Sequence, residues 1–329
     1  MEKERYRKIR ERTLQLYNKN PLLFKHFHDI SGGMKQVPSA IPTGNVNYLS
    51  NHDYLLDYHD LFQRNMGIFD KHFVASIPFL VEENCRIGVG IYRLAQHLVK
   101  EKDNYITLWE TGGGDGVNGR TMAEFSKGLI RTLSTSTSVN SKNNFYRLCN
   151  HDYSKFHHGS FINLTPEYIT SQQDLSFLYN GFNIIYENVT FPFYGSERED
   201  LIDYVARLLK KDSLIIFLEK LRHPDESEYR KREKIKDDQY KANYFSDSEI
   251  EEKRVDMLEV IERGQVDFKS LTNAIKKHFK YVYLIWNSAN FYEFVASNNE
   301  LIVSKFIELL PPIYVPSPFC AESNLPRNL

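Results

Sequence analysis

Five glycines fall within the twelve residues LWETGGGDGVNG, which run from Leu108 to Gly119. They follow an apolar run and precede a helical pattern. Glycine loses more conformational freedom on folding than any other residue, so a cluster of this kind needs a reason. A strand that ends in an acid, Glu110 here, and turns through glycines into a helix lets a ligand approach bare backbone and free N–H groups. The sequence therefore predicts a ligand-binding loop.

Two classes of ligand suit the spacing of these glycines. The segment 114–119 fits the G-x-G-x-x-G pattern of dinucleotide-binding loops. The segment 110–116 fits an acid followed by G-x-G-x-G, which is the pattern of enzymes that use S-adenosylmethionine. The glycines alone leave both ligand classes open.

The elements that must position this loop are those of a mostly parallel sheet. From residue 105 onward, short apolar runs alternate with helical patterns, which is typical of strands covered on both faces. The last two runs, YVYLIWNS and NFYEFVAS, are separated by one residue and predict an antiparallel hairpin. Between the loop and residue 181 we expect a helix over 119–133, a Ser/Thr-rich loop over 133–144, and strands over 144–149 and 160–164.

The chain divides by pattern into two parts. Residues 1–104 are mostly helical and predict a lid or substrate region, while residues 105–329 predict the ligand-binding domain. Within the second part, residues 222–257 are dense in charge and predict a solvated helical insertion.

Composition excludes several classes of protein. The net charge of −1 gives no overall attraction to nucleic acid or to acidic membranes. Three widely spaced cysteines favour a reducing compartment, and no apolar window approaches a membrane span, so we expect a cytoplasmic protein without membrane contact. The spacing of histidines and cysteines fits no metal site, and none is predicted.

From about Tyr105 to Asn299 the chain resembles the class I S-adenosylmethionine-dependent methyltransferase family. The acid–glycine loop, the segments GFNIIYENVTFPF and EDLIDYVARLLKKDSLIIFLEK, and the terminal hairpin carry this resemblance. It implies an α/β, Rossmann-like, seven-stranded and mostly parallel sheet with a terminal antiparallel hairpin, beneath an N-terminal helical lid. It also implies an enzyme with S-adenosyl-L-methionine as its cofactor.

The resemblance assigns cofactor-binding roles by position. The glycine loop would hold the methionine part, an acid after the second strand would bind the ribose, and residues after the third strand would contact the adenine. The corresponding residues are Glu110, Gly112, Gly114 and Gly116 for the loop, Asp152 for the ribose, and Asn163 with Leu164 for the adenine.

The resemblance also places the end of the fourth strand at the methyl-transfer site. There we expect Glu187 and Asn188 to act in catalysis and Tyr186 to contact substrate. The sequence continues as Val189-Thr190-Phe191-Pro192, which departs from the Asn/Asp-Pro-Pro-aromatic signature and argues against methylation of a base or a glutamine.

A hydroxyl or ammonium acceptor must lose a proton, so a general base is expected, most often histidine. The polar cluster in NYLSNHD, between the N-terminal helices, predicts His52 as this base and Tyr48 and Asn51 as substrate contacts.

Several acceptors fit these features. A small molecule is favoured, because the N-terminal hundred residues could close a pocket. A protein or peptide is the alternative acceptor, with residues 222–257 as its docking surface. The chain could alternatively be a catalytically inactive, cofactor-binding regulatory subunit. Nucleic acid is disfavoured, since no basic stripe with interleaved aromatic residues is evident. The resemblance also allows a homodimer, because N-terminal helices of such enzymes often exchange between subunits.

Overall fold

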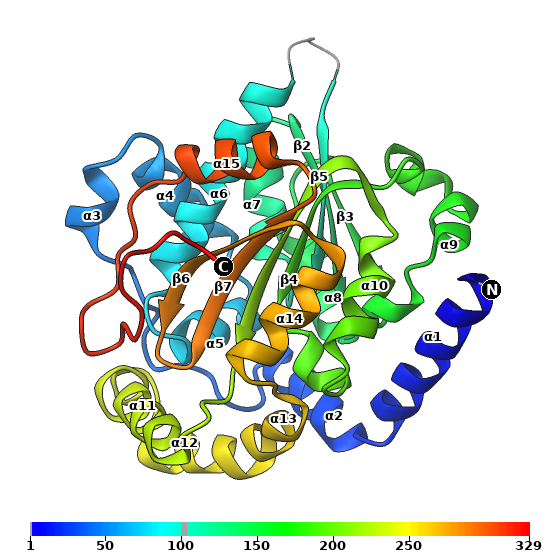
Figure 1. The fold of residues 1–329 in the computed structure, drawn as a ribbon. Helices are drawn as coiled ribbons and strands as arrows, with labels where there is room; N and C mark the ends of the chain where they lie inside the picture. Colours follow the sequence, from blue (N-terminus) through cyan, green and yellow to red (C-terminus); the bar gives the residue numbers. More distant parts are fainter. Residues whose placement is uncertain (1, 100–103) are drawn as a thin grey trace.

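The computed structural model describes residues 2–99 and 104–329 of the chain. At its centre lies one eight-stranded sheet in the order β3-β2-β1-β4-β5-β7-β6-β8 (Figure 1). The strands are β1 (Ile106–Thr111), β2 (Ile130–Ser136), β3 (Ser154–His158), β4 (Phe182–Asn188), β5 (Leu209–Lys220), β6 (Tyr281–Ser288), β7 (Phe291–Ser297) and β8 (Arg327–Asn328).

Helices surround the sheet on both faces and along one edge (Figure 1). Their bounds are α1 (Glu2–Asn18), α2 (Pro21–Ser31), α3 (Val46–Ser50), α4 (Leu55–Asn65), α5 (Ile68–Ser76), α6 (Leu80–Leu98), α7 (Val117–Phe125), α8 (Val139–Leu148), α9 (Pro166–Ser171), α10 (Arg198–Ala206), α11 (Glu226–Gln239), α12 (Asp247–Lys253), α13 (Glu259–Gly264), α14 (Phe268–His278) and α15 (Glu300–Leu309). Within the described ranges, no helix combines the length and apolar character needed to cross a membrane.

The sheet has the predicted mixed topology. β1 to β5 run parallel, and β7 lies antiparallel between β5 and β6. The hairpin turn consists of Ala289, which has a positive φ of 52°, and Asn290. Seven strands form the sheet as expected, although two of them, β2 and β3, lie at other residues than predicted, and the two-residue β8 adds an eighth at the β6 edge. The expected Rossmann-like architecture is thus confirmed.

The structure corrects the elements predicted between residues 119 and 164. Helix α7 ends early because Lys127 and Gly128 adopt positive φ, and the Gly128 N–H donates to the Ala123 carbonyl at 3.0 Å. The following run, predicted as the end of that helix and a loop, is instead the buried strand β2. Residues 144–149, predicted as a strand, belong mainly to α8, whose N-cap Ser138 accepts from the Ser141 N–H. The third strand is therefore β3, and residues 161–163 form a 3₁₀ turn instead of a strand.

Two hydrophobic clusters hold the sheet between its layers. On one face, α4, α6, α7 and α15 pack over residues such as Leu108 and Ile216. On the other, α1, α10 and α14 pack over residues such as Trp109 and Phe217. The first cluster combines residues of α3 to α6 with residues of the sheet, so the predicted boundary at residue 104 crosses one continuous core. Residues of α3 to α6 therefore belong to the same core as the sheet.

A buried ion pair fixes the start of α10 to the end of β5. Arg198 donates through Nε to Glu219 Oε1 at 2.7 Å and through Nη2 to Glu219 Oε2 at 2.8 Å, and Nη2 also donates to the Gly264 carbonyl at 3.0 Å. Burial raises the pKa of Glu219, and the charge of Arg198 opposes that rise. Burial, followed by the charge of Glu219, raises the pKa of Glu187 well above its ordinary value.

We predict that Arg198→Met lowers the free energy of unfolding by about 3–5 kcal/mol at neutral pH, since it leaves a buried carboxylate unpaired. Urea unfolding measures this difference. In the variant the pKa of Glu219 stays above its unfolded value, so the loss should shrink as the pH falls through the raised pKa and below the ordinary glutamate pKa, where the carboxyl is neutral in both states. The double variant Arg198→Met/Glu219→Leu should recover most of the stability. A single variant as stable as the wild type would contradict the assignment.

Candidate functional site

The carboxyl ends of the parallel strands enclose a cavity of about 510 Å³, including the open space at its mouth. We call it the first cavity. It is bounded by the glycine loop, by the residues after β2, β3 and β4, and by α2 and α5, which lie at that edge of the sheet (Figure 1). Its lining residues are Phe24, Phe27, Ser31, Phe69, Gly112, Gly114, Thr135, Ser136, Thr137, Ser138, Ser141, Gly159, Phe161, Thr190, Phe193 and Tyr194.

The glycine loop serves both the cavity and the packing of the protein. Gly112 and Gly114 have φ of +66° and +55° and line the first cavity. A Cβ atom at Gly112 would lie 2.0 Å from Thr190 Oγ1, and one at Gly114 would lie 2.4 Å from Phe69 Cδ1. The space freed by the missing side chains is therefore used in part by neighbouring side chains of the chain itself.

Gly116 has a different place from the other two predicted glycines. It is the N-cap of α7 with φ of +82°, and a Cβ atom there would lie 2.6 Å from the ring of Phe145. It is not among the residues that line the first cavity. The turn and the packing of α8 against α7 account for this glycine.

Glu110 lies beneath the loop and is fully buried. Its Oε1 accepts from Asn118 Nδ2 at 2.8 Å and from Asn188 Nδ2 at 3.1 Å, and its Oε2 is 3.4 Å from the donor Ser134 Oγ. Burial raises the pKa of Glu110, while the bonds from Asn118 and Asn188 oppose the rise. The Glu110 carboxylate thus links β1 to α7 and to β4 through these hydrogen bonds.

The segment after β4 has a strained backbone. Val189 has a φ of +48°, which is rare for a β-branched residue and is found at functional sites. Glu187 Oε1 accepts from the backbone N–H groups of Thr190 and Phe191, and Thr190 Oγ1 donates to the Thr111 carbonyl at 2.8 Å. Glu187 therefore shapes the turn from below, and only Asn188 of the predicted pair reaches a cavity.

A second cavity of about 690 Å³, open space included, adjoins the first. Both are lined by Phe27, Phe69, Gly112 and Phe193. The remaining residues around the second cavity are His72, Phe73, Ser76, Ile77, Asn188, Val189, Lys220, Lys236, Lys241, Lys253, Met257, Leu258, Ile261 and Phe291. The two cavities thus meet at the glycine loop and the end of β4.

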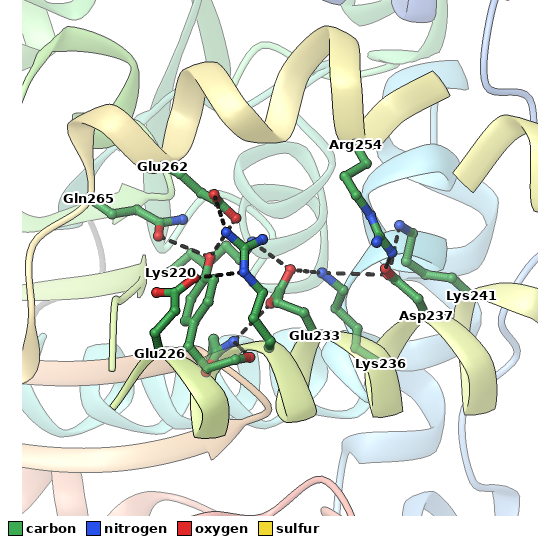
Figure 2. A network of polar contacts seen from close by, with 12 residues as sticks. Lys220, Glu226, Glu233, Lys236, Asp237, Lys241, Arg254, Glu262 and Gln265 are labelled. Carbon is green, nitrogen blue, oxygen red and sulfur yellow. Dashed lines mark hydrogen bonds and ion pairs between the residues drawn. The ribbon is translucent and has the colours of Figure 1, made fainter. Parts of the chain in front are cut away.

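The charged insertion contributes unexpected side chains to this second cavity. Residues 222–257 were predicted as a solvated excursion, yet Lys236, Lys241 and Lys253 are all buried. Figure 2 shows Lys236 between Glu233 and Asp237 along one side of α11. Sequence reasoning missed this site because a run of mixed charges looks the same whether its lysines face water or a cavity. The π-helical turn 254–258 that follows α12 gave no signal either.

The ribose and adenine predictions rested on the wrong strand assignments. Asp152 is exposed in the turn before β3, at the opposite edge of the sheet from the glycine loop. Asn163 accepts from Arg10 Nη2 at 3.0 Å, and Leu164 belongs to the hydrophobic core. None of the three lines either cavity. The residues that follow β2 are Thr137 and Ser138, so no acid stands there.

The predicted substrate cluster lies elsewhere. Tyr48 donates to the Pro312 carbonyl at 2.6 Å and stacks on Tyr314, and His52 packs edge-on against Tyr48. Asn51 is exposed at the end of α3. Tyr186 is buried in the core and donates to Glu293 at 2.8 Å. These four residues are absent from the lining of both cavities.

Helix α5 is fastened to the glycine loop by two aspartates. Asp70 Oδ1 accepts from the Asp115 N–H at 3.2 Å, and Asp115 Oδ2 accepts from the Phe69 N–H at 2.9 Å. Asn144 also donates to Asp115 at 3.0 Å, and Arg120 lies 3.7 Å from Asp70. Burial and the neighbouring Asp115 raise the pKa of Asp70 well above its ordinary value. This reciprocal pair holds Phe69 against Gly114.

No protein-family model matches the sequence, and no curated protein matches it. Several solved structures resemble the chain at low sequence identity. The plantazolicin methyltransferase BpumL, in complex with a monoazolic desmethylPZN analogue and SAH, is 13% identical over 88% of this chain and 99% of that chain, with a TM-score of 0.48. A Klebsiella pneumoniae protein described as a candidate O-methyltransferase is 13% identical over 77% of this chain and 96% of its own, with a TM-score of 0.43.

A third structure is a SAM-dependent methyltransferase of Thermotoga maritima, described as a possible histamine N-methyltransferase. It is 13% identical over 75% of this chain and 96% of its own, with a TM-score of 0.37. Likeness at these scores carries neither an activity nor a substrate. The strand order, the inserted antiparallel strand and the glycine loop themselves give the chain the Rossmann-like fold of class I S-adenosylmethionine-dependent methyltransferases, as the sequence predicted.

We predict that Asp115→Ala loosens the N-terminal end of α5, because the Phe69 N–H loses its charged acceptor. A hydrogen bond to a charged group contributes about 1.5–3 kcal/mol, so amide exchange at Phe69 should accelerate at least roughly tenfold. Hydrogen–deuterium exchange of the peptide covering residues 67–76 measures this. Asp115→Asn keeps an acceptor oxygen and should show a smaller effect. Unchanged exchange in the alanine variant would refute the role given to Asp115.

Proposed function

We propose that the chain is an S-adenosylmethionine-dependent methyltransferase whose acceptor is a small molecule. The observation that carries this proposal is the continuity of the two cavities at Gly112, between the glycine loop and Asn188. A cofactor in the first cavity would thereby present its reactive end to an acceptor in the second.

The residues of the first cavity fit this cofactor. Gly112 and Gly114 line it with bare backbone, and Asn188, which lines the second cavity beside Gly112, has a buried Oδ1 atom without a hydrogen-bond partner among the described residues. A carbonyl oxygen of this kind can accept from an ammonium group, such as that of the methionine part. Gly112, Gly114 and Asn188 would hold that part, and Glu110 would support them without touching it.

The nucleoside end would lie along the ends of β2 and β3. Ser136 and Ser138 line the cavity where the family carries an acid, and their hydroxyls can donate and accept hydrogen bonds to ribose. Phe161 and Gly159, after β3, form the wall next to them. Asp152, Asn163 and Leu164 are replaced in this proposal by these residues.

The bound cofactor would supply an electrophilic methyl group, and the chain would align the acceptor and exclude water. Phe27, Phe69 and Phe193 line both cavities and would keep the junction dry. His52 is given no step, since it reaches neither cavity. A small acceptor is favoured over a protein segment because residues of helices α2, α5 and α11 to α13 line the second cavity.

We predict that Gly114→Val weakens binding of S-adenosylhomocysteine at least tenfold, because the side chain would displace Phe69 from the junction and strain a left-handed residue. Isothermal titration calorimetry measures the affinity. Gly128→Val is the matched control: it strains a glycine with φ of +83° against Tyr153, far from both cavities, and should retain wild-type affinity.

Equal affinity of wild type and Gly114→Val, or no binding by the wild type, would count against the proposal. Formation of S-adenosylhomocysteine from S-adenosylmethionine in a screen of small acceptors separates an enzyme from a regulatory subunit. A protein that binds the cofactor and turns over no acceptor would support the subunit alternative.

A further inference from the structure

Four lysines gather around the second cavity: Lys220 at the end of β5, Lys236 in α11, Lys241 after it, and Lys253 at the end of α12. We call them the lysine cluster. None is more than 3% exposed. Lysine is almost never fully buried unless its charge is paired, so each ammonium group must be accounted for.

Two carboxylates compensate part of this charge. Glu233 Oε2 accepts from Lys220 at 2.8 Å and from Lys236 at 2.6 Å (Figure 2). Asp237 Oδ1 accepts from Lys241 at 2.9 Å, while its Oδ2 accepts from Arg254 at 2.7 Å. The described ion pairs of the cluster thus set two acids against three lysines and a half-exposed arginine, and Lys253 is in none of them.

Lys253 is the member without an acidic partner among the described residues. Its Nζ atom lies 2.7 Å from His72 Nε2 and 2.6 Å from Ser76 Oγ, and both of these groups are neutral acceptors. The His72 ring also contacts the Gln36 carbonyl through Nδ1 at 2.9 Å, which places the ring proton on Nδ1 and leaves Nε2 to accept.

Electrostatics agree with this geometry. Burial, and then the charges of Lys241 and Lys236, lower the pKa of Lys253 well below its ordinary value. Burial and the charge of Lys253 likewise lower the pKa of His72. The site is therefore electropositive and desolvated, a condition that an anion entering it would relieve.

The rest of the second cavity defines what kind of anion fits. Met257, Leu258 and Ile261 form an apolar wall beside the lysines, and Gly112 and Asn188 lie at the junction with the first cavity. A ligand bound by the lysines would therefore have an apolar body between its charged group and the glycine loop.

We propose that the methyl acceptor is a small molecule with a carboxylate or phosphate group, which binds to Lys253, Lys241 and Lys236 and directs the acceptor atom toward Gly112. That this molecule is the methyl acceptor rests on the proposed methyltransferase function. The anion site itself stands on the buried lysines alone.

The test uses the full-length protein and two simple anions, inorganic phosphate and acetate. Thermal unfolding is followed during titration of each anion at constant ionic strength. The wild type should show a saturable rise in melting temperature with at least one of them, because a ligand that binds only the folded state stabilises it. The anion with the stronger effect indicates whether the acceptor carries a phosphate or a carboxylate.

Two variants give this titration its specificity. Lys253→Met should need at least tenfold more anion for the half-maximal shift, and its melting temperature without anion should equal or exceed that of the wild type. Lys210→Met is the control: Lys210 is a half-buried lysine that donates to Asn183 at 2.9 Å and does not line this cavity, so its response should match the wild type. General salt effects would act on all three proteins equally. If Lys253→Met does not fold, Lys241→Met takes its place.

The proposal is overturned if neither anion gives a saturable shift in the wild type, or if Lys253→Met responds as the wild type does. Calorimetry with S-adenosylhomocysteine on the same proteins separates the two proposals. Cofactor binding without an anion response defeats only the anion site, and an anion response without cofactor binding defeats only the methyltransferase assignment.

Discussion

The Glu110 carboxylate is the interaction on which the arrangement of the site depends. It is buried at the end of the central strand and accepts from Asn118 on α7 and Asn188 on β4. A buried carboxylate without such donors would be strongly unfavourable, so the three elements are held in a fixed relation. The glycine loop lies directly above: a Cβ atom at Gly113 would be 2.7 Å from Glu110 Oε2. The Glu110 side chain therefore fixes the positions of both the glycine loop and Asn188.

The N-terminal helices are fastened to this loop with specific polar bonds. Asp70 accepts from the Asp115 N–H and Asp115 accepts from the Phe69 N–H, while Ser31 of α2 contacts Ser141 of α8 at 2.9 Å. The same region continues without a break into the core, where α4 and α6 cover a face of the sheet. The N-terminal helices thus have two structural roles. Helices α3 to α6 contribute to the core, and of the helices α1 to α6, α2 and α5 supply residues to the cavities.

Local sequence patterns predicted the fold where strands are continuous and apolar. The runs around Ile185 and Ile216 and the terminal hairpin were placed correctly, because burial on both faces leaves a clear mark on sequence. β2 was missed because IRTLSTS holds only two apolar residues, three apart, among Arg, Ser and Thr, which also suit loops, and because Gly128 ends α7 without interrupting the apolar pattern. That one error displaced the expected second and third strands, and with them Asp152 and Asn163.

Only part of the candidate site could be predicted from the sequence. Of the residues predicted for the site, Gly112, Gly114 and Asn188 line the cavities, and they lie at the ends of strands that were recognised. Glu187 and Tyr186 neighbour Asn188 in sequence, yet strand alternation and the turn after β4 direct them into buried contacts. The buried lysines could not be predicted, because their burial depends on how α11 and α12 pack against the end of β5 and against α5.

Phe69 and Phe27 form a partition with one face toward each cavity. A molecule that shifts this partition from one side changes the room available on the other. If a ligand in one cavity changes the affinity for a ligand in the other by some factor, then by thermodynamic linkage the second ligand changes the affinity for the first by the same factor. The two aromatic rings therefore couple the occupancy of one compartment to that of the other.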